Sequence, residues 1–309
     1  WGSSDAVKRW IDGRGTASRS RRRYRILFFK DRNSYLQQLS PLVPGVEVST
    51  GYYDSKAEIS FFYDGDKTSE DTWRHELTHQ LFRESGRATN QKAFENQFIW
   101  LDEGIATYAE STTKNQHLFG EIYTLGGFDS RRMQYARFRR FLENYFIPSK
   151  ELSDLGRVQL QQRNDLVKIY SESAGLAEFL MNSERGTLQP KLNQFLKIMY
   201  QGKVKPGRFQ SEIGKTFLEL DEQYVDFLKI QPSEITRFLI RPDLKTELSL
   251  PGVNLNLDDF EAIGKCTKLS WLDLSGSRLP DACFSKLKQC GQLNQLFLNG
   301  CQLEEGALT

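Results

Sequence analysis

Hydrophobic and polar positions change their spacing along the chain. An apolar run over residues 24–29 predicts a buried strand, and two further strands over 47–53 and 58–63 are expected to meet at a short turn. From Ser69 onward, apolar positions recur every three or four residues, which predicts helices over 70–85, 91–113, 130–146, 164–183, 189–201 and 208–229. Strands followed by helices indicate an α+β domain.

The end of the chain repeats its apolar positions every 24 residues. Leu248, Leu272 and Leu296 occupy one position of the repeat, and Leu255, Leu279 and Leu303 occupy another. A period of about 20–29 residues with a Leu-x-x-Leu-x-Leu core is typical of leucine-rich repeats, in which one strand and one helical segment per copy stack on the next. We therefore expect a short solenoid over 243–309, incomplete at its C-terminal end, with a curved surface that recruits a protein substrate or partner.

All the cysteines lie in this repeat region, at positions 266, 283, 290 and 301. Such clustering is compatible with disulfides or with a metal site. Cys266 and Cys290, however, stand one repeat apart, where the helical segment of each copy buries a small side chain. We therefore predict packing thiols, a role that suits free cysteine, and the redox compartment stays undecided.

Composition and charge exclude some partners. Lys and Arg total 42 and Asp and Glu total 40, so the net charge of +2 attracts neither nucleic acid nor an anionic membrane. The basic run over 19–25 predicts a solvated N-terminal arm (1–23), since a phosphate-binding patch would need more basic neighbours. No stretch reaches the roughly 18–20 consecutive apolar residues of a membrane span. The chain opens on Trp1 without a signal peptide, which suggests a processed or trimmed chain and leans toward an extracytoplasmic compartment.

The motif with the clearest chemistry is His75-Glu76-Leu77-Thr78-His79, inside the predicted helix 70–85. Two imidazoles four residues apart lie on one helical face and can share a metal ion, while Glu76 beside them is placed to accept a proton from the attacking water. The chain has 3 histidines, and two of them stand in this motif. We interpret His117, in a polar stretch that suggests a helix end, as a surface residue, with metal binding as the alternative.

A catalytic zinc ion needs a third protein ligand and an open position. The segment WLDEGIATYAE supplies Glu103, 24 residues beyond His79, at a distance that leaves room for a loop and a returning helix. Glu110 follows on the same helical face and could orient a zinc-binding histidine through its other ring nitrogen, with a solvated helix residue as the alternative. Asp102, a sequence neighbour of Glu103, is expected to point elsewhere.

HELTH followed by WLDEGIATYAE resembles the gluzincin metallopeptidases, in particular their peptidase-MA-like and aminopeptidase-N-like branches. The resemblance implies a zincin-like domain over 24–242, with a small sheet and helices. It also implies that Zn²⁺ is the cofactor, held by His75, His79 and Glu103, and that the reaction is hydrolysis of a peptide bond. The small residues after Glu103 would let its helix approach the HExxH helix closely, while residues 80–99 form an insertion of uncertain shape.

The resemblance also implies a tyrosine that opens a later helix and stabilises the oxyanion. Tyr170 in IYSESAGLAEFL matches that place, and a core tyrosine is the alternative. The Gly-x-Met-Glu-Asn strand with which the aminopeptidases grip a free amino group has no counterpart here. Internal cleavage of a protein or peptide is therefore the expected activity.

Two other functions stay open. The chain could be a catalytically silent peptidase-like scaffold that acts as a protein-binding module, although a decayed site is expected to lose at least one required group. A zinc-stabilised structural domain is the third option, but structural sites usually fill all four positions with Cys or His.

Overall fold

The computed structural model describes residues 23–65, 69–84, 90, 92–117, 120–127, 130–280 and 282–303. The chain divides into two compact units, the first built from 1–126, 150–164 and 180–216, and the second from 127–149, 165–179 and 217–309. The second unit therefore combines the repeat region with helices from the middle of the chain. Nearly all of the predicted N-terminal arm lies outside the described residues.

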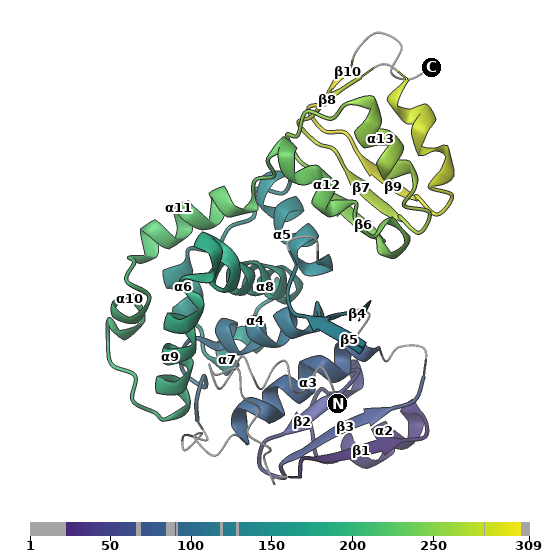
Figure 1. The fold of residues 1–309 in the computed structure, drawn as a ribbon. Helices are drawn as coiled ribbons and strands as arrows, with labels where there is room; N and C mark the ends of the chain where they lie inside the picture. Colours follow the sequence, from purple (N-terminus) through teal and green to yellow (C-terminus); the bar gives the residue numbers. More distant parts are fainter. Residues whose placement is uncertain are drawn as a thin grey trace. The chain divides into compact units, whose positions relative to one another are not determined.

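A three-stranded sheet of order β1-β3-β2 opens the first unit (Figure 1). Strand β1 (Arg25–Phe29) runs parallel to β3 (Ile59–Tyr63), and β2 (Tyr52–Asp54) pairs antiparallel with β3. Alternate side chains face opposite sides of a strand, so each face packs on a different helix. Phe28 and Phe62 contact Trp73 of α3 (Glu70–Arg83), whereas Phe29 contacts Tyr35 of α2 (Arg32–Leu39).

The prediction that residues 24–29 form a buried strand is wrong in its burial. These residues do form β1, but Ile26, Leu27 and Phe28 are 52%, 47% and 50% exposed. The reason is that β1 is an edge strand, and no other strand among the described residues pairs with its outer side. The apolar run therefore predicted the strand correctly but not its degree of burial.

The first unit contains several further elements, of which α4 packs on α3. They are η1 (Val46–Val48), α4 (Ile99–Glu110), β4 (Thr113–His117), β5 (Gly120–Thr124), most of α6 (Ser149–Asp154), α7 (Arg157–Gln161), η2 (Ser183–Gly186), α9 (Gln189–Tyr200) and α10 (Arg208–Ile213). The predicted helix 91–113 is shorter because the chain turns at Ser111 into the antiparallel hairpin of β4 and β5. His117 consequently ends a strand and not a helix.

The segment between α3 and α4 is held by later parts of the chain. The amide of Asn90 donates to the carbonyl of Tyr200 (2.8 Å), and the amide of Phe98 donates to that of Ser153 (2.8 Å). A Cβ at Gly156 would overlap the Glu95 carbonyl oxygen, so only glycine permits this close approach. These contacts tie Asn90, Glu95 and Phe98 to later segments and fix the point at which α4 begins.

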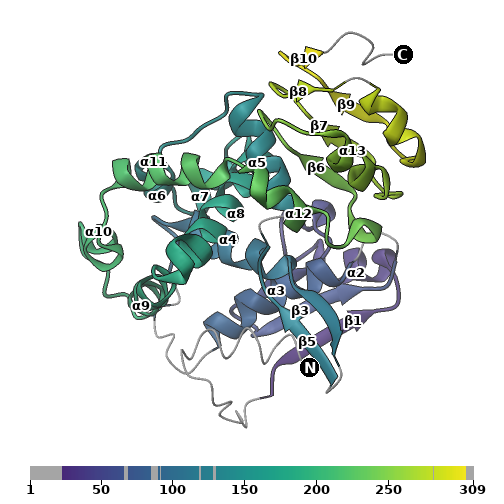
Figure 2. The ribbon, with the colours of Figure 1, turned by 45° about the horizontal axis from the view of Figure 1, so that its top comes forward.

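The second unit contains a parallel three-stranded sheet with the 24-residue step of the sequence repeat (Figures 1 and 2). Leu248 pairs with Leu272, and Leu272 pairs with Leu296. The elements are α5 (Arg131–Phe141), the first part of α8 (Leu166–Asn182), α11 (Phe217–Leu228), η3 (Pro232–Glu234), α12 (Ile235–Phe238), η4 (Pro242–Leu244), β6 (Glu247–Ser249), α13 (Leu257–Gly264), β7 (Trp271–Asp273), β8 (Arg278–Leu279), η5 (Cys283–Gln289), β9 (Gln295–Phe297) and β10 (Gln302–Leu303). The predicted helix 208–229 is thus two helices, because Gly214 (φ +77°) ends α10 in the left-handed conformation. Assignment of the stack to leucine-rich repeats stays a prediction.

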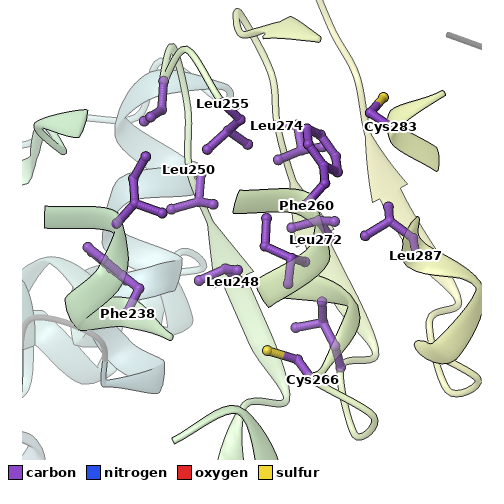
Figure 3. Close-up of a cluster of buried hydrophobic side chains, with 14 of the residues drawn as sticks. Phe238, Leu248, Leu250, Leu255, Phe260, Cys266, Leu272, Leu274, Cys283 and Leu287 are labelled. Atoms are coloured by element: carbon purple, nitrogen blue, oxygen red, sulfur yellow. The ribbon is translucent and has the colours of Figure 1, made fainter. Parts of the chain in front are cut away.

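Repeated leucines and cysteines form the core of this stack (Figure 3). Cys266, Cys283 and Cys290 are buried in it, and all four cysteines are free thiols, as the prediction of packing thiols requires. The thiol of Cys290 donates to the carbonyl of Ile263, one copy earlier. Burial raises the pKa of Cys266 to about 11, so this thiol is un-ionised and unreactive near neutral pH.

Helix α5 packs on the strand side of the stack. The ring of Phe138 lies 4.9 Å from that of Trp271 and 4.8 Å from that of Phe297. Gln134 accepts a hydrogen bond from the amide of Ser249 (2.8 Å), and Trp271 is only 5% exposed. Part of the surface expected to recruit a partner is therefore covered by the chain itself.

No helix among the described residues has the length and apolar character needed to cross a bilayer.

Candidate metal centre

Helix α3 places two imidazoles side by side. Ser69 caps its start by accepting from the amide of Thr72, and Glu70 and Asp71 favour the positive end of the helix dipole. With the helix set in this way, His75 and His79 share one face, and their Nε2 atoms lie 3.2 Å apart.

Helix α4 brings the third group. It packs directly on α3, and its residues from Ile99 to Ala109 are buried. Glu103 is 6% exposed, and its Oε2 lies 3.4 Å from Nε2 of His75 and 3.7 Å from Nε2 of His79. Elsewhere among the described residues, no other group of His, Cys, Asp and Glu brings three ligand atoms this close together.

The triangle of these three atoms fits a zinc ion. Zinc bonds to nitrogen and oxygen measure about 2.0–2.2 Å, which separates neighbouring ligands of a tetrahedral centre by roughly 3.3–3.6 Å. Of the observed edges, 3.4 Å lies within that range, and 3.2 and 3.7 Å lie about 0.1 Å outside it. Two imidazoles and one carboxylate are also a donor set of catalytic zinc sites, which keep the fourth position open.

Each imidazole has a carboxylate on its other nitrogen. Oε1 of Glu110 lies 2.8 Å from Nδ1 of His75, at the position predicted for it from helical spacing. Oδ1 of Asp102 lies 3.5 Å from Nδ1 of His79, so the expectation that Asp102 points elsewhere is wrong. Such carboxylates fix the ring orientation and leave Nε2 as the metal-binding atom.

Asp102 is itself held from several directions. The hydroxyl of Tyr200 donates to Oδ1 (2.8 Å), while Oδ2 accepts from Arg83 (3.3 Å) and Arg157 (3.4 Å). Arg83 stands four residues after His79, on the same helical face, and that spacing was the signal available in the sequence. Tyr200 and Arg157 come from distant segments and left no such signal.

Glu76 is positioned by the sheet. Its Oε2 accepts a hydrogen bond from the backbone amide of Tyr53 in β2 (2.9 Å). A Cβ at Gly51 would come within 3.2 Å of Cγ of Glu76, so a small residue at this place leaves room for the side chain. The hydrogen bond therefore fixes the orientation of the carboxylate, whose negative charge also acts on His75.

The surrounding carboxylates make the imidazoles strongly basic. Burial lowers the pKa of both rings, but the hydrogen bonds that His75 donates to Glu103 and Glu110 outweigh it and place the pKa of His75 well above its ordinary value. The charges of Asp102 and Glu103 likewise raise the pKa of His79 to about 9. A metal ion at this place would therefore compete with protons for the two imidazoles.

The carboxylates shift in the opposite direction. Burial raises the pKa of Glu103, yet the charge of His79 and hydrogen bonds from both imidazoles lower it well below the ordinary range. The pKa of Asp102 is lowered in the same way by His79 and Arg83 against the effect of burial. Both groups are therefore anionic at neutral pH, which suits a divalent cation.

Two further predicted residues stand on other elements. Tyr170 is half-buried in the part of α8 that belongs to the second unit, and its role at the oxyanion stays a prediction. His117 ends β4, and Glu103 takes the place that a third histidine would fill.

The comparisons with known proteins leave the chain without a family. No family model matches it, and no curated protein matches it significantly. The motif and the geometry of its side chains therefore carry the functional argument.

Proposed function

We propose that this chain is a zinc-dependent peptidase of the gluzincin type, with His75, His79 and Glu103 as the metal ligands. The observation that carries the proposal is the triangle of ligand atoms with edges of 3.2, 3.4 and 3.7 Å. A zinc ion bound there would supply a Lewis acid for the scissile carbonyl and a water of lowered pKa.

The protein groups would divide the remaining work. Glu76, next to the ligands and oriented by the amide of Tyr53, would accept a proton from the attacking water and return it to the leaving amine. Glu110 and Asp102 would hold the imidazoles in the orientation that directs Nε2 at the ion. Tyr170 is proposed to stabilise the oxyanion.

The proposed reaction is internal cleavage of a protein or peptide. Its support is the lack, in the sequence, of the motif with which aminopeptidases grip a free amino group. Recruitment of a protein partner by the repeats is also a proposal. Since α5 covers Trp271, such a partner would have to bind the rest of the repeat surface.

A silent scaffold that acts as a binding module is the second candidate. It would share the fold and even the metal, so only a test of turnover separates the two functions. The presence of Glu76 beside the ligands favours the enzyme, because metal binding alone does not require a carboxylate at that place.

The test compares variants at a ligand and at the proposed base. Metal analysis of the wild type should find about one zinc per chain, and His79→Ala should lose it. Glu76→Gln should keep the zinc but lower cleavage of an unstructured protein by at least about 100-fold, because the proton acceptor is gone. A peptide library read by mass spectrometry would show the cleavage preference.

Two further variants serve as controls. Glu70→Gln, on the exposed first turn of α3, should change neither zinc content nor cleavage. His117→Ala should keep the zinc if Glu103 is the third ligand. If wild type and Glu76→Gln treat the whole library alike, the binding module replaces the enzyme as the function of this chain.

A further inference from the structure

We propose that Tyr200 is a positioning residue of the metal centre, acting through Asp102 on His79. The inference rests on the proposed function, because it assumes that the three ligands hold a zinc ion. Tyr200 ends α9 and stands 97 positions beyond Glu103 in the sequence, in a segment that the motif does not include.

The two oxygens of Asp102 have separate partners. Oδ1, which faces Nδ1 of His79, accepts a hydrogen bond from the hydroxyl of Tyr200 (2.8 Å). Oδ2 accepts from Arg83 and Arg157 (3.3 and 3.4 Å). The arginines therefore balance the buried charge, whereas Tyr200 fixes the oxygen that meets the imidazole.

The ring of Tyr200 is held rigidly. It stacks on Phe82 (5.7 Å between centroids), meets Phe94 edge-on (5.2 Å), and has the guanidinium of Arg83 over its face (6.0 Å). The side chain is 5% exposed. Because packing alone places the ring, a phenylalanine can occupy the same position and lack only the hydroxyl.

The space behind His79 is narrow. A void lined by residues of α3, α4 and α9, among them His79, Asp102 and Tyr200, is too small to admit a water molecule. In the native structure, no solvent in this void can replace the phenol as donor to Oδ1. Loss of the hydroxyl should therefore free the carboxylate to rotate about its arginine contacts, and His79 with it.

The experiment compares Tyr200→Phe with Tyr224→Phe. Tyr224 is also buried, and its hydroxyl also donates a hydrogen bond to an acidic side chain, the carboxyl group of Glu172 (3.5 Å), but it belongs to the second unit. Zinc affinity is measured by competition with a chromophoric chelator, and Co²⁺ loading reports ligand geometry through its visible absorption. Tyr200→Phe should bind zinc about 10–100-fold more weakly and change the cobalt spectrum, whereas Tyr224→Phe should do neither.

A double-variant cycle tests the route through Asp102. If Tyr200 acts through that carboxylate, Tyr200→Phe should weaken zinc binding much less in an Asp102→Asn background than in the wild type. Zinc affinity within twofold of wild type together with an unchanged cobalt spectrum in Tyr200→Phe overturns the inference alone. A wild-type chain that takes up no stoichiometric zinc overturns the proposed function as well, so the two failures are distinguishable.

Discussion

Four carboxylates surround the two imidazoles of α3, and each has a different place. Glu103 meets both Nε2 atoms, Glu110 and Asp102 meet the two Nδ1 atoms, and Glu76 bonds to an amide of the sheet. Such an excess of negative charge in a buried site is unfavourable unless a cation or protons balance it. The arrangement supports the proposed metal site, in which the Nδ1 atom of each imidazole already meets a carboxylate.

Glu172 in α8 gives a residue-scale prediction that is independent of the metal. Its side chain is 2% exposed, and burial raises its pKa from the ordinary 4.5 to about 8. Between these values the folded chain keeps a proton that the unfolded chain releases. The free energy of unfolding should therefore fall as the pH rises through this window, by up to about 1.4 kcal/mol per unit.

Glu172→Gln should remove that slope, because an amide does not titrate and can still accept from Tyr224. Urea unfolding at pH 5, 6, 7 and about 8 measures how the free energy of unfolding changes with pH. The variant should gain stability relative to wild type as the pH rises. Glu222→Gln, exposed on α11, should keep the wild-type slope. Parallel curves for wild type and Glu172→Gln would show that Glu172 is not protonated in the folded chain.

At the scale of elements, α5 covers part of the strand side of the repeats. The strand side of a repeat stack is open in a free solenoid, and here Phe138 and Gln134 of α5 contact it. The apolar stripe of α5 was visible in the sequence, but its partner was not. A helix pattern states which face is buried and not against which element.

Trp271→Ala tests this packing. Trp271 is 5% exposed and meets Tyr135 (5.5 Å), Phe138 (4.9 Å) and Phe297 (5.7 Å). Removing a buried indole should cost about 3–5 kcal/mol, measured as a lower urea midpoint of the second unit.

The matched control is Val167→Ala, at a position of α8 that is 66% exposed. It should stay within about 0.5 kcal/mol of wild type. Equal stability of the two variants would mean that α5 does not hold the strand side in solution.

For the whole molecule, zinc and protons should compete for one site. In the metal-free chain His79 has a pKa of about 9, so zinc must displace its proton at neutral pH. The apparent zinc affinity should therefore rise with pH, by up to tenfold per unit for each displaced proton, and the part of this rise that comes from His79 should end above about 9. Calorimetry in buffers of different ionisation enthalpy measures the released protons.

The same linkage predicts a change in thermal stability. Zinc at about 1,000 times its dissociation constant should raise the free energy of unfolding by about 4 kcal/mol, seen as a higher melting temperature. His79→Ala should show no zinc-dependent shift. A melting temperature that zinc raises equally in both proteins would place the bound ion elsewhere.

The sequence by itself determined the features that a few neighbouring residues encode. Helical spacing placed His75, His79 and Glu110 on matching faces, and the 24-residue period gave the register in which Leu248 pairs with Leu272. Both follow from fixed geometry, because a helix turns every 3.6 residues and stacked copies repeat their contacts.

Only the tertiary structure decided the contacts that join distant segments. The exposure of Leu27 in β1, the turn of Asp102 toward His79, the amide of Tyr53 on Glu76 and the hydroxyl of Tyr200 are of this kind. No regular sequence spacing predicts these contacts, since each depends on which elements pack together and at what angle. The ligands of the proposed metal site can therefore be recognised from short sequence motifs. The groups that hold them in place come from distant segments, which only the fold brings together.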